Sequence, residues 1–478
     1  MSKTKRIVML CSIVTLAFLA MVLLGHRSSS AKALQAYKAT LRARGEKLTY
    51  AEFIAGRKPA TNNSLAAITN AVRNLEGSRL QPGLLEVMKF EGPGQARVTW
   101  KESQPHWTAS PPASLSWAEL GEVLTAVKMN LDDIRRALED PAPDMGVRSN
   151  LFTMPRPFVA IRGAAQWLAV AAIMELHRGN LEEALKTIEA LAALARLHRE
   201  DGTLVSQMIR VAVAGLGLNV TWEALQAPGW TEPQLQRLQR AWAALDLIAG
   251  LEQGFTGERA GGEDFFTSMR EGRSQNPFAM FNVNNSSRRL DQAALLALYR
   301  LTSINDDELL YLETMQGVID CIRRFQSVPW FEVKSAMDNN FASVNQISGP
   351  IQRYHYWFTL VALPNYQRAV QAAAQKETQR QMTLTSIALK RYLLENGHPA
   401  TTLEALVPQF LPALPRDYFG TGSLQYRIQS DGSAVLYSVG ADGHDDQGAS
   451  DPAQNGQAPD FWSGRDAAWP LAVGSTNR

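Results

Sequence analysis

The sequence predicts a mainly α fold: a large irregular helical bundle or array after an N-terminal transmembrane helix, followed by a small C-terminal α+β domain with an antiparallel β-hairpin. Three observations predict it. A charge-free apolar run lies near the N-terminus, apolar residues recur at helical spacing over about residues 31–396, and strand-like segments follow near the C-terminus. We therefore divide the chain into a membrane anchor (1–30), an extracytoplasmic helical domain (31–365), and a long helix with a β domain and a flexible tail (366–478).

Composition excludes some classes of protein. The chain has 478 residues, of which 45% are hydrophobic, so it can bury a large core. Its 48 basic and 46 acidic residues give a net charge of +2, which argues against a dedicated nucleic-acid-binding protein. Its two cysteines exclude a disulfide-rich scaffold and a four-thiolate zinc site, and we expect Cys321 to be buried.

The N-terminal apolar run is long enough to cross a bilayer. It extends from Ile7 to Gly25 without a charged residue and follows Lys3, Lys5 and Arg6. A cleaved signal sequence is the alternative, because Ala31-Lys32-Ala33 fits a signal-peptidase site. The length of the run favours an uncleaved anchor. The short segment before the apolar run is a poor candidate for export across the membrane. We therefore place the chain that follows the run outside the cytoplasm.

Several helices of the middle region can be placed from their patterns. One helix is predicted to begin with a capping box at Ser116 and to end at Leu138. Another is predicted from Thr231 to Gly250. A third feature is a hairpin of helices 164–177 and 181–196, with Gly179 at the turn. The hairpin resembles one tetratricopeptide-type helix pair, which would bind peptides. We favour an ordinary hairpin, because a solenoid normally needs at least three units.

Residues 254–289 are rich in glycine and asparagine and predict a long mobile loop over the helical body. Glu258 and Arg259, or Glu263 and Asp264, would supply acid and base groups if the loop closed a cleft. A hydrolase-type enzyme is therefore one alternative function. The chain contains no zinc-protease helix, hydrolase elbow or phosphate-binding loop, so we predict no enzyme activity, no catalytic residue and no small-molecule substrate.

The C-terminal region changes character. A helix from about Gln367 is predicted to end at Asn396-Gly397, and residues 402–407 predict a short helix. Residues 425–428 and 434–438 are predicted to form two strands, with a turn at 430–433. A second irregular region is expected at 91–94 and 103–112, where proline, glycine and serine gather.

The tail over about 383–446 resembles the C-terminal domain of the major pseudopilin (protein G) of type II secretion. The matching positions keep their order and spacing: Arg391-Tyr392, Glu395-Asn396-Gly397-His398-Pro399, Leu403-Glu404-Ala405-Leu406-Val407-Pro408, Leu411-Pro412, Leu414-Pro415, Asp417, Gly420, Tyr426 and 437–443. The start of the chain departs from that family, since it has no prepilin-peptidase site and no glutamate within the apolar run. The resemblance therefore implies the fold of the tail and not assembly into a filament.

The resemblance also implies a structural calcium ion in the loop after the last predicted strand. By resemblance, Asp442 is a side-chain ligand and Val439 offers its carbonyl oxygen. Asp445 or Asp446 would be a second carboxylate, and Asp451 or Asp460 a later one. Calcium prefers six to eight oxygen ligands, and carboxylates so close together suit it. An acidic turn without a metal is the alternative.

These observations together predict a single-pass protein of the bacterial inner membrane with its body facing the periplasm. We expect a structural or interaction role, associated with a type II secretion or pilus-like system. The expected partners are the membrane and envelope or secretion-machine proteins, and no nucleic acid.

Overall fold

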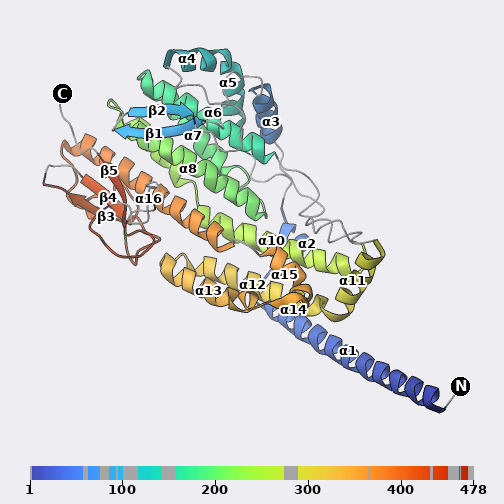
Figure 1. Cartoon of the computed structure of the whole chain (residues 1–478). Helices are drawn as coiled ribbons and strands as arrows, with labels where there is room; N and C mark the ends of the chain where they lie inside the picture. The colour runs from blue at the N-terminus through green and yellow to red at the C-terminus, as the bar shows by residue number, and fades with distance from the viewer. Residues whose placement is uncertain are drawn as a thin grey trace.

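The computed structural model describes residues 3–57, 63–75, 85–92, 95–100, 117–141, 157–273, 289–363, 366–430, 434–449, 462 and 465–471. Within these residues the chain is mainly helical and carries a small three-stranded antiparallel sheet near its C-terminus, which confirms the predicted fold class at that level. The sheet lies at one end of the molecule, and the N-terminus lies at the other (Figure 1).

Helix α1 (Lys3–Ala43) is the longest element and contains the whole apolar run. Its first part projects beyond the rest of the molecule, whereas its last part lies against α11 (Arg289–Thr302) and α12 (Ile304–Arg324) (Figure 1). Val14 and Met21 in the projecting part are 61% and 70% exposed.

The helical body is built from packed helices of very different length. They are α2 (Tyr50–Ile54), α3 (Ser64–Leu75), α4 (Trp117–Ala126), α5 (Lys128–Ala137), α6 (Phe158–His177), α7 (Leu181–Arg196), α8 (Leu204–Gln226), α9 (Glu232–Ala243), α10 (Leu247–Arg270), α11, α12, α13 (Trp330–Asn345), α14 (Gly349–His355), α15 (Trp357–Ala362) and α16 (Tyr366–Asn396). One continuous core runs from Leu34 in α1 to Trp469 in the sheet, and Cys321 is buried in it as expected.

The predicted helical hairpin forms as α6 and α7. Gly179 has φ +76°, a left-handed conformation that turns the chain sharply between them. Helix α8 packs against both, so the apolar surface of the pair is covered rather than left as a groove. By length and composition, α6 and α8 are also apolar enough to cross a membrane, and 61% of the apolar window of each is buried within the molecule.

Residues 254–270 are helical, so the predicted loop is wrong over that range. They continue α10, and 289–302 form α11, while 274–288 lie outside the described residues. The glycines of α10 serve close helix packing. A Cβ atom at Gly257 would overlap the backbone of Gly202, and one at Gly262 would overlap the ring of Tyr311 on α12. Glycine here lets backbones approach, instead of loosening the chain.

Two other helix boundaries differ from prediction. The helix expected over 116–138 is divided at Val127 into α4 and α5, and Ser116 lies outside the described residues. The second helix starts at Thr231 as predicted, where Thr231 and Gln234 form a capping box, but it ends at Ala243. Gly250 lies inside α10, where Arg210 and Gln207 leave no room for a side chain.

A β-hairpin, missed from the sequence, occupies part of the region expected to be irregular. Strands β1 (Leu85–Gly92) and β2 (Gln95–Trp100) pair antiparallel, so the Gly-Pro-Gly segment separates two strands. Residues 103–112 lie outside the described residues.

The tail forms much as predicted. Helix α16 ends at Asn396, and Gly397 has φ +74°. Strands β3 (Gln425–Ile428) and β4 (Ala434–Ser438) pair with Gln425 opposite Tyr437, and a third strand, β5 (Ala467–Leu471), extends the sheet. The short helix is a single turn, η3 (Glu404–Leu406). Helix α16 packs against α8, α9 and α10 as well as β4, so it joins the sheet to the body.

Candidate functional site

The last part of α1 is held in the body by a buried cluster of charges. Lys38 lies on the same face of α1 as the buried Leu34 and Leu41. Its ammonium nitrogen lies 2.6 Å from Glu263 Oε1 of α10 and also pairs with Glu308 of α12. Arg270 pairs with Glu308 from the other side. We call these four residues the Lys38 cluster; it ties three helices together at one point.

The two carboxyl groups of the Lys38 cluster titrate differently. Burial, together with a hydrogen bond and charge repulsion involving Glu308, raises the pKa of Glu263 from 4.5 to about 8. Burial also opposes ionisation of Glu308, but the bond from Glu263 and the charges of Arg270 and Lys38 outweigh it and lower its pKa. Burial therefore favours the neutral acid at Glu263, whereas the neighbouring cations favour the carboxylate at Glu308.

This assignment predicts a pH-dependent stability. Because the folded pKa of Glu263 lies above the unfolded value of 4.5, its contribution is full below about pH 4.5 and is lost as pH rises through about 8. Glutamine has the shape and hydrogen bonds of the neutral acid, so E263Q should lack this loss, which amounts to about 1.4 kcal/mol per unit of pKa shift. Melting temperatures of both proteins from pH 5 to pH 9 check it. If the melting temperatures of the two proteins change with pH in the same way between pH 5 and pH 9, Glu263 is already ionised at pH 5 and the prediction is wrong.

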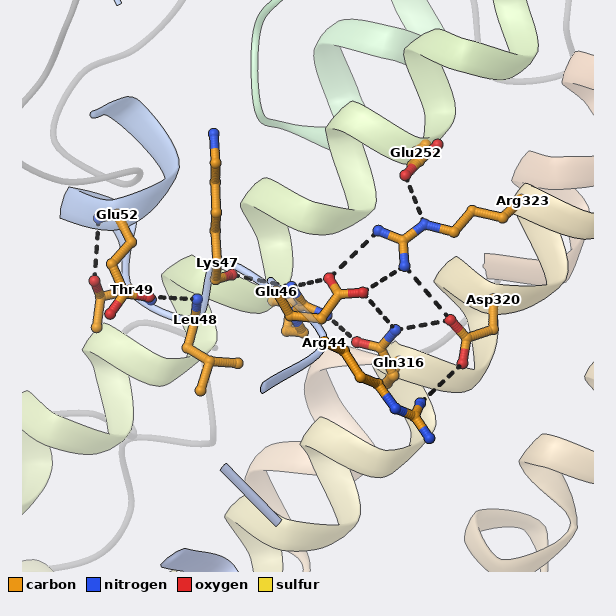
Figure 2. Close-up of polar contacts among 11 residues, drawn as sticks. Arg44, Glu46, Lys47, Leu48, Thr49, Glu52, Glu252, Gln316, Asp320 and Arg323 are labelled. Carbon is orange, nitrogen blue, oxygen red and sulfur yellow. Dashed lines mark hydrogen bonds and ion pairs between the residues drawn. The ribbon is translucent and has the colours of Figure 1, made fainter. Parts of the chain in front are cut away.

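A second buried cluster lies directly after α1. Glu46 accepts a hydrogen bond of 2.9 Å from Arg259 of α10 and one of 3.2 Å from Gln316 of α12, and it pairs with Arg323. Figure 2 shows Glu46 beside Arg323 and Gln316, with Glu252 on the far side of Arg323. Burial opposes ionisation of Glu46, but Arg323 and Arg259 outweigh it and lower its pKa to about 2. Glu46 is thus a permanent anion between two guanidinium groups.

The contacts of Arg259 and Glu258 differ from those expected of acid and base groups in an open loop. Arg259 has no exposed surface and also bonds the carbonyl oxygen of Lys47, so it is not an open cleft residue. Glu258 accepts a 2.9 Å hydrogen bond from the backbone of Leu204. The acidic and basic groups expected in a loop are instead on a helix that packs in the core, where they fix α1 and the turn before α8. The arrangement binds helices together and leaves no space for a substrate at Arg259.

Three side chains of residue types that can bind metals lie together where α1 leaves the body. Among the described residues, the one group of three His, Cys, Asp or Glu side chains with ligand atoms within 4.8 Å of one another is His26, Asp306 and His355, which we call the His26 cluster. Nε2 of His26 lies 3.0 Å from Asp306 Oδ2, and Nε2 of His355 lies 3.1 Å from the same oxygen. The imidazoles oppose the effect of burial and lower the pKa of Asp306.

The predicted calcium ligands lie on one loop but have separate partners. Val439 is buried, and its amide donates to the buried Asp417. Asp442 Oδ1 accepts from the amide of His444 at 3.0 Å, and Asp445 Oδ1 accepts from Tyr437 at 3.0 Å. Asp446 lies 3.6 Å from Arg465. Their side-chain oxygens do not gather within 4.8 Å here, while Asp451 and Asp460 lie outside the described residues. Calcium binding stays a prediction.

Sequence reasoning missed most of these residues. Lys38 could have been found, because a lysine at the spacing of Leu34 and Leu41 falls on the apolar face of its helix. The other partners offer no local signal, since Lys38 and Glu263 are 225 positions apart and His26 and Asp306 are 280 positions apart.

Comparison with known protein families, with curated proteins and with solved structures finds no match for this chain.

Proposed function

We propose that this chain is a single-pass protein of the bacterial inner membrane whose helical body faces the periplasm and has a structural or interaction role. The proposal rests on the construction of α1. One continuous helix contains the charge-free run Ile7–Gly25 and a later part that is fixed in the body by the buried Lys38 cluster. A bilayer-spanning helix fixed in this way would hold the body at a set position on the membrane surface.

The surface around the exit of α1 supports this placement. Helix α11 exposes Leu295, Leu298 and Leu301, which are 44%, 47% and 38% exposed, and α14 exposes Ile351 at 82%. Both helices pack near α1, because α11 contacts α1 and α14 contacts α11 and α12. Tyr354 of α14 is half-buried, and its hydroxyl donates to the carbonyl oxygen of Leu295 on α11, so it joins the two helices. Apolar and aromatic side chains of this kind suit the interface of a bilayer.

The cleaved-signal alternative is less favoured by the same contacts. The Ala31–Ala33 segment lies inside α1, between buried Ser30 and Leu34. Cleavage there would remove Ser30 and also His26, which bonds Asp306 of the body. An uncleaved α1 retains all of these contacts.

The tail supports the proposed association with a secretion or pilus-like system. We propose that α16, the β3–β4 hairpin and the loop after it form a pseudopilin-like unit, as the resemblance implies. Asp417, one of the matching positions, accepts hydrogen bonds from Phe419 and Val439 and so fixes the loop to β4. Since the unit packs on the body through α16, it would present a fixed surface to envelope partners rather than join a filament.

Deletion of residues 3–25 tests the membrane placement. We expect the full chain to stay in the membrane pellet after alkaline carbonate extraction and the shortened chain to become soluble. A protease added to spheroplasts should digest the body of the full chain, which would show that it faces the periplasm. In vivo crosslinking of the full chain then identifies partners. Release of the full chain by carbonate, or protection of its body in intact spheroplasts, would contradict the proposal.

A further inference from the structure

We propose that the His26 cluster binds a transition-metal ion of the zinc class, and that the ion fastens α1 to the body where α1 leaves it. Two imidazole nitrogens and one carboxylate oxygen form a ligand set that zinc uses widely, with water completing a tetrahedral site. The three residues come from three different elements: α1, the first turn of α12, and the end of α14. A bound ion would therefore join them.

The spacing of the ligand atoms fits such an ion. The two Nε2–Oδ2 distances are 3.0 and 3.1 Å. In a tetrahedral site with bonds of about 2.0–2.1 Å, neighbouring ligand atoms lie about 3.3 Å apart. Small rotations of the side chains would admit the ion. Each residue offers one ligand atom, and the three ligand atoms lie within 4.8 Å of one another.

The backbone holds the three ligands in place without the ion. Asp307, next to Asp306, is buried and accepts hydrogen bonds from the amides of Phe358 (2.8 Å) and Thr359 (3.0 Å). These bonds fix the segment after His355 to the start of α12. His26 is positioned by the buried part of α1 that begins at Ser30. The ligands are thus preorganised, which lowers the entropic cost of binding.

The site is open to solvent on one side. The side chains of His26, His355 and Asp306 are 51%, 25% and 19% exposed, so an ion can enter and keep a water ligand. If α1 spans the bilayer, the site lies close to the membrane surface. The metal site itself does not depend on the membrane placement, because its ligands and their supports are all in the described body and α1.

Metal titration of the full chain, purified in mild detergent without a histidine tag, tests the proposal. We expect about one equivalent of Zn²⁺ to bind in competition with a chromophoric chelator, and Co²⁺ to give the visible absorption of a tetrahedral site. H26N, D306N and H355N should each weaken binding more than about 100-fold, since even loss of a supporting residue costs about 10–100-fold. H444N is the matched control, because His444 also lies beside an aspartate, Asp442, but far from the cluster in sequence.

Two results would overturn the proposal. One is the absence of saturable Zn²⁺ binding to the wild-type chain. The other is equal binding by the wild type and all three ligand variants, which would place the metal elsewhere. Circular dichroism of each variant shows whether it is folded, so a loss of binding through unfolding is recognised. Neither result bears on carbonate extraction, so failure of the metal site and failure of the membrane placement are distinguishable.

Discussion

Replacing Lys38 with methionine should lower the free energy of unfolding by about 3–5 kcal/mol, the usual cost of removing one partner from a buried ion pair. Methionine matches the length and apolar stem of lysine, so the change removes mainly the charge. Glu263 would then lose the ammonium group that it contacts, and Arg270 would be the remaining cation of the cluster beside Glu308. Urea denaturation of the full chain in mild detergent measures the loss.

K32M is the matched control for this prediction. Lys32 lies on the same helix, six positions earlier, and is exposed. Its replacement should change stability by no more than about 0.5 kcal/mol, as for most surface substitutions. Equal, small effects of K38M and K32M would mean that the buried cluster does not hold α1.

Replacing Gly257 with alanine should also destabilise the protein strongly, by about 3 kcal/mol or more, because overpacking against backbone is poorly relieved. The new Cβ atom would overlap the carbonyl group of Gly202. Helix α10 would have to move away from the turn before α8, and that movement would disturb Glu258 and Arg259 on the same turn of helix. A lower melting temperature checks the prediction.

G215A provides the comparison. Gly215 is also inside a helix, but an added Cβ there would meet the flexible end of Lys376, at 2.9 Å from Cε, rather than backbone. Lys376 can move, and alanine favours the helix by about 1 kcal/mol over glycine. We therefore expect G215A to be close to neutral or slightly stabilising. If G257A were as well tolerated as G215A, that result would contradict the close contact between α10 and the backbone of Gly202.

The elements that could be predicted from sequence are those with local signals. Gly179 and Gly397 end helices in the left-handed conformation, and the short segments 425–428 and 434–438, with a turn signal between them, form two strands with the bounds that were predicted. Each depends on residues only a few positions apart. Strand β5 was missed because its sequence, with Pro470, lacks an alternating pattern; it forms by pairing with β4.

The remainder depends on contacts between distant residues. The glycines of α10 are typical of a loop when considered alone, and only the approach of Gly202 and Tyr311 explains them in a helix. Similarly, Glu263 was considered as a loop acid, yet its role follows from Lys38 and Glu308 on other helices. The His26 cluster joins residues from both halves of the chain. Periodicity describes one helix at a time and does not identify its partners.

In the proposed arrangement α1 remains whole, with one part in the membrane and the other fixed in the body. Intact-mass measurement of the full chain, extracted from native membranes with detergent, tests it most directly. We expect a mass that includes the apolar run Ile7–Gly25, from protein found in the membrane fraction. A mature chain that begins after Ala33, recovered from the soluble periplasmic fraction, would contradict it.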